Sequence, residues 1–349
     1  MGTADLANLS DKLMLTTVVL YIVAMASYAA DLGFGRRRTK AEAASPVMEE
    51  KAEEKAEEKA KVLVGAGTSG TDAPVAAVKA DDDAASASDS GSNSGSAELE
   101  RTQVDWARLA VVLNVLGWAA HLGTIATRGL AAERWPWGNM YEFLTAIAFA
   151  AVTAFLVVLW RFQARFLGAF VTLAAVVALG IANIWLYNSV GPLVPALNSY
   201  WIAIHVTAAI IATGAFTVGG ATTILYLLKA RQEARAAAGG GTFLDRLPGA
   251  DALDRLSLRV TMFAFPIWTA AIIMGAVWAD DAWGRYWGWD PKEIWSFVTW
   301  VAYAAYLHAR ATAGWKGRRA AVLSLIAFAA LLFNFFGVNY MFSGLHSYA

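Results

Sequence analysis

Long apolar stretches alternate with short polar ones along most of the chain. A transmembrane helix needs about 20 mostly apolar residues, and eight stretches approach that length. They cover residues 13–30, 107–127, 140–160, 166–187, 201–228, 260–279, 294–310 and 320–341. The pattern predicts an all-α, polytopic membrane protein with about eight transmembrane helices and a tryptophan-rich outer loop between the sixth and the seventh.

A long polar stretch interrupts this pattern after the first apolar one. Residues 31–105 hold 10 Lys/Arg and 16 Asp/Glu, and residues 40–100 contain no aromatic side chain. Such a segment cannot bury enough apolar surface to fold. We therefore expect three parts: an N-terminal transmembrane helix over 1–30, a charged and largely disordered cytoplasmic linker over 31–105, and a seven-helix core over 106–349.

Basic residues are distributed unevenly between the connections. They are frequent after the first, third, fifth and seventh apolar stretches. The alternate segments carry only Lys12, Arg128, Arg134, Arg285 and Lys292. Because cytoplasmic loops carry the excess of Lys and Arg, we expect a multi-pass protein of the plasma membrane with both termini outside the cytoplasm.

The same rule assigns the connecting segments. It places the loops 128–139, 188–200 and 280–293 on the outer face. Residues 243–259 alternate Leu with charge at helical spacing. We expect them to form an amphipathic segment on the cytoplasmic surface.

The composition narrows the class of protein. Of the 349 residues, 58% are apolar and 16% are charged, whereas a soluble domain has about half and about a quarter. This excludes an ordinary water-soluble enzyme, and no basic patch indicates nucleic acid. Without Cys the chain has no disulfide, thiolate metal site or thiol redox chemistry of its own, so any thiol in its reaction belongs to a partner.

Tryptophan is concentrated around the predicted outer loop at 280–293. Six of the 15 Trp residues lie between positions 278 and 300, and Trp283, Trp287 and Trp289 fall within seven residues with two glycines between them. Interfacial location explains one or two Trp residues, but not this spacing. We expect a flat aromatic surface for a flat, apolar ligand, for which a porphyrin, a quinone or a lipid headgroup are the candidates.

The loop ends in a helix-start signal. Asp290, Pro291 and Glu293 stand at the N-cap, first and third positions of a capping box. We expect Asp290 to cap the seventh span, a role that does not exclude contact with a ligand.

The predicted topology places the four histidines. His205 lies about one turn into the fifth span and His346 just beyond the eighth, so both flank the Trp-rich loop on the outer face. Two imidazoles beside an aromatic surface can fill both axial positions of a haem. His308 lies about 20 Å deeper, at 1.5 Å per residue, and indicates a second site. A zinc site is the weaker alternative, since no His-x-x-x-His spacing, Cys or adjacent carboxylate pair is present.

The segment 283–296, WGRYWGWDPKEIWS, resembles the WWD signature, WGxxWxWD, of the haem-handling protein superfamily. Within it the chain resembles the CcsA family, also called ResC, or CcsB in actinobacterial naming, of system II cytochrome c maturation. The resemblance covers about residues 105–349. It includes His121, Pro136, Asn139, Tyr141, Glu142 and the GAVWA before the loop. The length and eight-span layout favour CcsA over the shorter CcmC and the longer CcmF.

The resemblance implies a site for reduced haem b on the outer face. The WWD loop, with Trp283, Trp287, Trp289 and Asp290, presents the haem. His205 and His346 are implied as axial ligands of its iron. His308 is implied in an earlier, inner haem site shared with a membrane partner of the ResB type (CcsB in other naming), and His121 in a supporting role.

The resemblance also implies the reaction. The outer haem meets the Cys-x-x-Cys-His segment of an apocytochrome c, and two thioether bonds form between its thiols and the haem vinyl groups. This makes the chain a component of a cytochrome c synthase, or haem lyase, that depends on its partner. Thiol-reducing proteins act indirectly by keeping the substrate reduced, and membrane lipid surrounds the helices.

Two other functions remain open at this point. The chain can be a haem exporter and chaperone that leaves attachment to the ResB partner. It can also be a haem- or quinone-binding subunit of a respiratory complex. That last function predicts paired histidines at matching depths, and His308 has no inner-side mate in the sequence.

Overall fold

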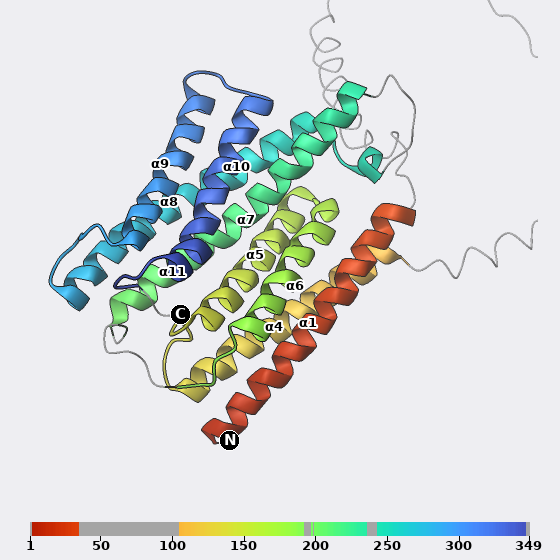
Figure 1. The fold of residues 1–349 in the computed structure, drawn as a ribbon. Helices are drawn as coiled ribbons and strands as arrows, with labels where there is room; N and C mark the ends of the chain where they lie inside the picture. Colours follow the sequence, from red (N-terminus) through yellow and green to blue (C-terminus); the bar gives the residue numbers. More distant parts are fainter. Residues whose placement is uncertain (1, 35–104, 192–196, 198, 236–242, 347–349) are drawn as a thin grey trace, which may run out of the picture. The chain divides into compact units, whose positions relative to one another are not determined.

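The computed structural model describes residues 2–34, 105–191, 197, 199–235 and 243–346, and every regular element there is helical (Figure 1). Seven helical segments are long and apolar enough to cross a membrane. They are α1 (Thr3–Phe34), α4 (Trp106–Ala132), α5 (Met140–Phe162), Arg165–Trp185, which holds η2 (Arg165–Leu167) and α6 (Gly168–Trp185), α7 (Tyr200–Arg235), α8 (Ala250–Trp283) and Arg318–Met341. They coincide with seven of the eight predicted spans and confirm an all-α membrane protein.

The remaining predicted span, 294–310, is also a helix. It forms α9 (Pro291–Ala311), which packs against α8 and α10 (Arg318–Leu332). It is not among the seven most apolar segments. Charged and titratable side chains at both ends, Glu293 at the start and His308 with Arg310 at the finish, reduce its apolar length.

Two of the predictions concern segments that connect the apolar stretches. The predicted linker falls on residues 35–104, outside the described residues. The predicted amphipathic segment at 243–259 has Leu247, Leu253 and Leu256 on its buried side, and it is continuous with the sixth span. After η5 (Phe243–Arg246), the chain enters α8 at Ala250 and continues through the sixth span without a break.

The helices form two sets with matching contacts (Figure 1). In the first set, α1 packs against α4 and α6, and α5 packs against α6. In the second, α7 packs against α8 and α10, and α9 packs against α10. The order α1–α4–α5–α6 therefore reappears as α7–α8–α9–α10, and contact between α5 and α7 joins the two sets.

A polar seam holds α1 against α4. The buried positions repeat every three or four residues on both helices: Ser10, Met14, Thr17, Tyr21, Ala24 and Tyr28 on α1, and Ala110, Asn114, Gly117, His121, Thr124 and Arg128 on α4. At Gly117 a Cβ would lie 2.7 Å from the Tyr21 ring, so only glycine permits this approach. Small and polar residues typically form such interfaces in membranes.

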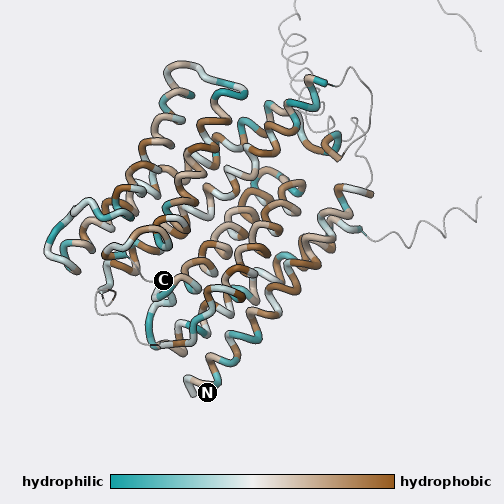
Figure 2. Tube along the Cα trace, viewed as in Figure 1, coloured by the Kyte–Doolittle hydropathy of each residue, from teal (hydrophilic) through white to brown (hydrophobic). Residues whose placement is uncertain are grey.

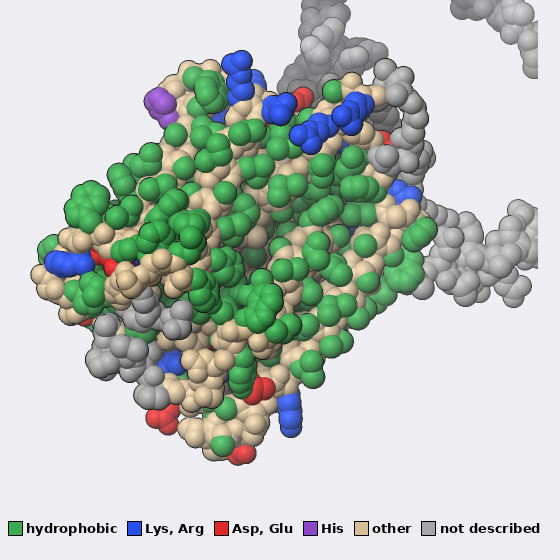
Figure 3. Space-filling view, in the orientation of Figure 1, with side chains coloured by type: hydrophobic (Ala, Val, Ile, Leu, Met, Phe, Trp, Pro, Cys, Tyr) green, Lys and Arg blue, Asp and Glu red, His purple; other side chains and the backbone are tan. Residues whose placement is uncertain are grey.

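The surface agrees with a membrane-crossing bundle. Apolar residues occupy the middle of the helices and hydrophilic ones concentrate at their ends and connections (Figure 2). In the face shown in Figure 3, hydrophobic side chains cover the middle, and most of the visible Lys and Arg side chains lie toward the end where α9 connects to α10. The α8–α9 loop lies at the opposite end of the bundle, and the candidate functional site lies there too.

Candidate functional site

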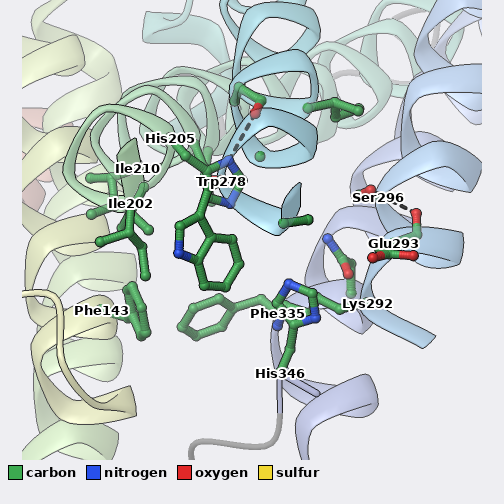
Figure 4. A pocket seen from close by; sticks show the side chains of 18 of the residues that line it. Phe143, Ile202, His205, Ile210, Trp278, Lys292, Glu293, Ser296, Phe335 and His346 are labelled. Atoms are coloured by element: carbon green, nitrogen blue, oxygen red, sulfur yellow. Dashed lines mark hydrogen bonds between the residues drawn. The ribbon is translucent and has the colours of Figure 1, made fainter. Parts of the chain in front are cut away.

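A cavity lies between α5, α7, α8, the start of α9 and the C-terminal segment (Figure 4). The cavity has a volume of about 160 Å³ and opens to the outside. His205, Trp278, Trp287, Lys292 and His346 line it. Most of the remaining lining is aliphatic or aromatic, including Phe143, Ile147, Ile202, Ile210, Leu331 and Phe335. It is therefore an apolar chamber with a few polar side chains, as small-molecule sites usually are.

His205 enters the cavity from the second turn of α7. Its Nδ1 lies 2.8 Å from the Ala271 carbonyl oxygen of α8. Because a carbonyl only accepts, the proton is on Nδ1 and the Nε2 lone pair is available for a metal. Gly275, one turn further along α8, gives the ring its space: a Cβ there would lie 2.6 Å from His205 Cε1.

His346 enters from the chain after α11 (Val338–Met341). Its Nδ1 donates to Asp290 Oδ1 at 2.9 Å, and Asp290 Oδ2 accepts the Leu345 backbone N–H at 2.7 Å. Burial alone would raise the pKa of Asp290. The hydrogen bonds from His346 and Leu345 outweigh it and hold that pKa below its usual value. A carboxylate that orients the far side of an imidazole is the arrangement found behind many metal-binding histidines.

Trp278 brings the two histidines together. It is 1% exposed. The His205 ring stacks on it with a centroid distance of 6.0 Å and an angle of 9°. The His346 ring meets it edge-on at 5.6 Å and 68°. His205 and His346, which the topology placed near the same face, therefore line one cavity and both contact a buried indole that the sequence reasoning did not select.

The three predicted loop tryptophans have different positions. Trp287 lines the cavity. Trp283, the last residue of α8, packs edge-on against Trp278 at 4.7 Å and His346 at 5.0 Å. Trp289 is 69% exposed and lies perpendicular to Trp287 at 5.8 Å. The expectation of a flat aromatic surface is therefore wrong, since the rings stand at steep angles and only one of them lines the cavity.

The backbone of Trp289 is unusual. Its φ is +59°, in the left-handed region that favours glycine. A bulky residue adopts this conformation at a cost, which the surrounding structure must hold in place. Strain of this kind concentrates at functional sites, and here it keeps a large indole exposed beside the cavity.

The capping box predicted at the start of α9 is confirmed. Asp290 Oδ1 accepts the Lys292 backbone N–H at 3.1 Å, and Glu293 Oε2 accepts the Asp290 N–H at 3.0 Å. Glu293 also accepts the Gly288 N–H at 2.8 Å and pairs with Arg285 at 3.3 Å. One carboxylate therefore holds most of the aromatic loop, while the neighbouring Asp290 serves both the helix and His346.

The α4–α5 loop repeats this arrangement. Arg134 pairs with Glu142 at 2.9 Å, eight residues on, as Arg285 does with Glu293. The Gly138 N–H donates to Glu142 at 2.7 Å, and Asn139 caps α5 by accepting the Glu142 N–H at 3.0 Å. Arg128 adds a second ion pair to Glu142 at 2.9 Å. The two halves of the bundle thus share a loop design as well as their helix contacts.

Lys292 is a cavity residue that the sequence reasoning used only to count charge. Its Nζ donates to Asn339 Oδ1 at 2.7 Å and lies 5.6 Å from the centroid of the Phe335 ring. Phe335 belongs to the π-helical turn η6 (Phe333–Gly337) between α10 and α11. Such turns often occur at functional sites, and a hydropathy pattern does not reveal them.

The other two histidines lie elsewhere. His308 is exposed near the end of α9 and does not line the cavity. His121 is fully buried, with its Nδ1 3.3 Å from Tyr21 Oη, in the α1–α4 seam. Among the described residues no group of three or more His, Cys, Asp or Glu side chains is placed to hold a metal ion, so the weaker zinc alternative has no cluster there.

A second, wider cavity runs beside the first, between α4, α5, α7 and α8. It extends from Arg134 at one end to Arg161 and Arg259 at the other, and its lining is mostly apolar. Ile202 and Ile210 line both cavities, so they form part of the wall between them.

Comparison with known proteins identifies the family of this chain. The family model described as cytochrome C assembly protein matches residues 137–346. The chain is 33% identical over 276 residues to the cytochrome c biogenesis protein CcsA of Gloeobacter violaceus, covering 65% of this chain and 82% of that one. It is 33% identical over 281 residues to CcsA of Porphyra purpurea, covering 69% and 87%.

A solved structure shares the fold. The chain superposes on the cytochrome c haem lyase CcmF with a TM-score of 0.59 at 15% sequence identity, over 96% of this chain. It spans just under half, 47%, of the length of that protein. At this identity the likeness concerns the helix arrangement alone.

Proposed function

The chain belongs to the cytochrome c assembly protein family, and from this premise we propose that it binds haem b in the His205–His346 cavity and attaches it to apocytochrome c. A ResB-type membrane protein is its proposed partner in that reaction. The Cys-x-x-Cys-His segment of the apocytochrome supplies the thiols, since this chain has no Cys.

One observation carries the proposal. Two imidazoles face the same apolar cavity, and each holds its Nδ1 proton against an oxygen, that of Ala271 for His205 and that of Asp290 for His346. This tautomer places the lone pair on Nε2 of both rings, which is the donor set for the two axial positions of a haem iron.

The residues around the ligand have positioning roles. Haem, as substrate, supplies the reactive vinyl groups. Each thiol adds across one vinyl double bond: a carbon–sulfur bond forms, the proton goes to the neighbouring carbon, and nothing is oxidised overall. Trp287, Trp278 and the apolar lining exclude water and hold the ring. Fixing vinyl and thiol together is the main source of acceleration available here.

The proposal includes an orientation and a second site. The Lys- and Arg-rich end of the bundle faces the cytoplasm, and the cavity, the loop at 284–290 and both termini face outward across the plasma membrane.

His308 lies exposed on α9, about 17 residues and roughly 25 Å of helix from Pro291. We assign it to an inner haem site completed by the partner, because it has no second imidazole beside it in the described part of the chain.

Visible absorption spectra of the purified, detergent-solubilised protein test the outer site. Wild type should retain haem b with a low-spin, two-histidine spectrum, and His205→Ala or His346→Ala should lower its haem content. His308→Ala, purified without partner, is the matched control and should retain the outer haem. Unchanged haem content in both cavity variants would refute the ligand assignment.

A second experiment tests attachment. The chain and its ResB-type partner are incubated with reduced haem and a Cys-x-x-Cys-His peptide, and the thioether product is measured by mass and by its absorption. Haem retention without product would instead favour the exporter and chaperone function.

A further inference from the structure

We infer that Lys292 binds a carboxylate of the ligand in the His205–His346 cavity, so that the site selects a tetrapyrrole with free propionate groups. This rests on the proposed function and deepens it, because it adds a third, charge-based contact to the two axial ligands. It also sets which edge of the ring faces outward.

The position of Lys292 suits this role. It is the second residue of α9, directly after Pro291, and its side chain lies on the His346 side of the cavity (Figure 4). The capping contacts of Asp290 and Glu293 hold this turn in place. The ammonium group is therefore carried by a rigid element, which a recognition contact needs.

Lys292 is stabilised in its charged form by the nearby Asp290 carboxylate. Among the described residues it forms no ion pair, and its Nζ donates to the neutral amide oxygen of Asn339. Both neighbouring carboxylates are engaged: Asp290 with His346 and Leu345, and Glu293 with Arg285 and Gly288. An ammonium group carries three donors, so it has capacity for a further acceptor.

The surroundings make an anionic acceptor favourable. The cavity around Lys292 is largely apolar, with Phe335, Leu331 and Trp278 in its wall. A charge in such a place is costly unless it is paired. A ligand with an apolar body and a carboxylate on its edge satisfies both the lining and the cation. Haem has this chemistry, since its two propionates lie on one edge of the ring and its vinyl groups lie away from that edge.

This contact has a consequence for attachment. Two axial imidazoles allow the ring to rotate about the line that joins them. A carboxylate anchored at Lys292 removes that freedom and presents the vinyl groups at a defined place. Positioning of this kind is worth far more to a bimolecular reaction than the strength of the contact itself.

The test compares two ligands in two proteins. Haem b and its dimethyl ester, in which both propionates are neutral, are titrated by absorption into wild type and Lys292→Met. Wild type should bind haem about 10- to 100-fold more tightly than the ester, the range of a charge-assisted hydrogen bond. Lys292→Met should bind haem as weakly as the ester, with ester affinity unchanged. Lys316→Met, at an exposed position after α9, is the matched control and should discriminate as wild type does.

The other outcomes are distinguishable. If Lys292→Met still prefers haem over the ester, or if it weakens both ligands equally, Lys292 does not bind the carboxylate. If wild type binds both ligands equally, this inference fails while the proposed function stands. If wild type binds neither ligand, the proposed function fails with it. An unchanged two-histidine spectrum in bound Lys292→Met shows that the variant is folded at the site.

Discussion

His346 Nδ1 and Asp290 Oδ1 form a hydrogen bond of 2.9 Å across 56 residues of sequence. Asp290 is at the same time the N-cap of α9. The chain end that follows the last helix is therefore tied to the first turn of α9, and the histidine it carries is held against Trp278 and Trp283. The position of one proposed iron ligand thus depends on a residue whose local role is to start a helix.

Substitution of Asp290 by Asn separates its two roles. Asn is as good an N-cap as Asp, so the start of α9 should persist. The charge that orients His346 is lost, and the amide cannot accept the Leu345 N–H with its nitrogen. We expect the affinity for haem to fall about 10- to 100-fold, measured by absorption titration. A variant with wild-type affinity would show that His346 needs no carboxylate.

Gly275 controls the space of His205. A Cβ at this position would lie 2.6 Å from the imidazole, so Gly275→Ala must displace the ring or separate α7 from α8. Haem content should fall toward that of His205→Ala. Gly180→Ala on α6 is the matched control, because nothing lies within 4 Å of its Cβ. Equal haem content in the two variants would contradict this account of the site.

Trp289 should respond differently to Gly and to Ala. Both substitutions remove the indole, but only Gly adopts a φ of +59° without strain. Trp289→Gly should therefore be more stable than Trp289→Ala by about 1 kcal/mol, measured by thermal unfolding in detergent. At Trp160, which is 79% exposed on α5, the order should be reversed because its backbone is helical. The same order at both positions would be evidence against backbone strain.

Glu142 and Glu293 hold corresponding loops with unequal burial. The Glu142 side chain is 0% exposed and its partners Arg128 and Arg134 are 4% and 11% exposed, whereas Arg285 opposite Glu293 is 32% exposed. Glu142→Gln leaves two buried cations without a carboxylate and should cost about 3–5 kcal/mol. Glu293→Gln should cost clearly less, since water reaches its partner. Thermal unfolding of the two variants compares them, and equal destabilisation would show that burial does not decide the cost.

Much of the bundle follows from local pattern. The apolar stretches end within two residues of the helix ends for α5 and α6, and the capping box at Asp290 formed as its residues indicate. The hydropathy pattern did not predict the start of α8, because this helix continues from an amphipathic segment into an apolar one. Residues 250–259 are amphipathic, yet they belong to the same helix as the sixth span, α8, which packs against α7.

The candidate site was predictable in its histidines but not in its supports. Counting turns and loops placed His205 and His346 at the same end of the bundle, and both line the cavity. The roles of Trp278, Lys292 and Asn339 could not be predicted in this way. They depend on contacts between different helices, which the residue pattern within one helix does not show. The flat aromatic surface failed for the same reason: sequence spacing places Trp287 and Trp289 near each other but does not set the angle between the rings.

The sequence by itself determined that this protein crosses a membrane as a helical bundle, because helix length and apolar composition are properties of each segment alone. It also predicted that the Trp-rich loop, His205 and His346 lie at the same end of the bundle, since successive apolar stretches alternate in direction. Only the tertiary structure decided which side chains share the cavity. That choice depends on the packing of α7 against α8 and on the return of the chain end to Asp290, and both bring together residues that are far apart along the chain.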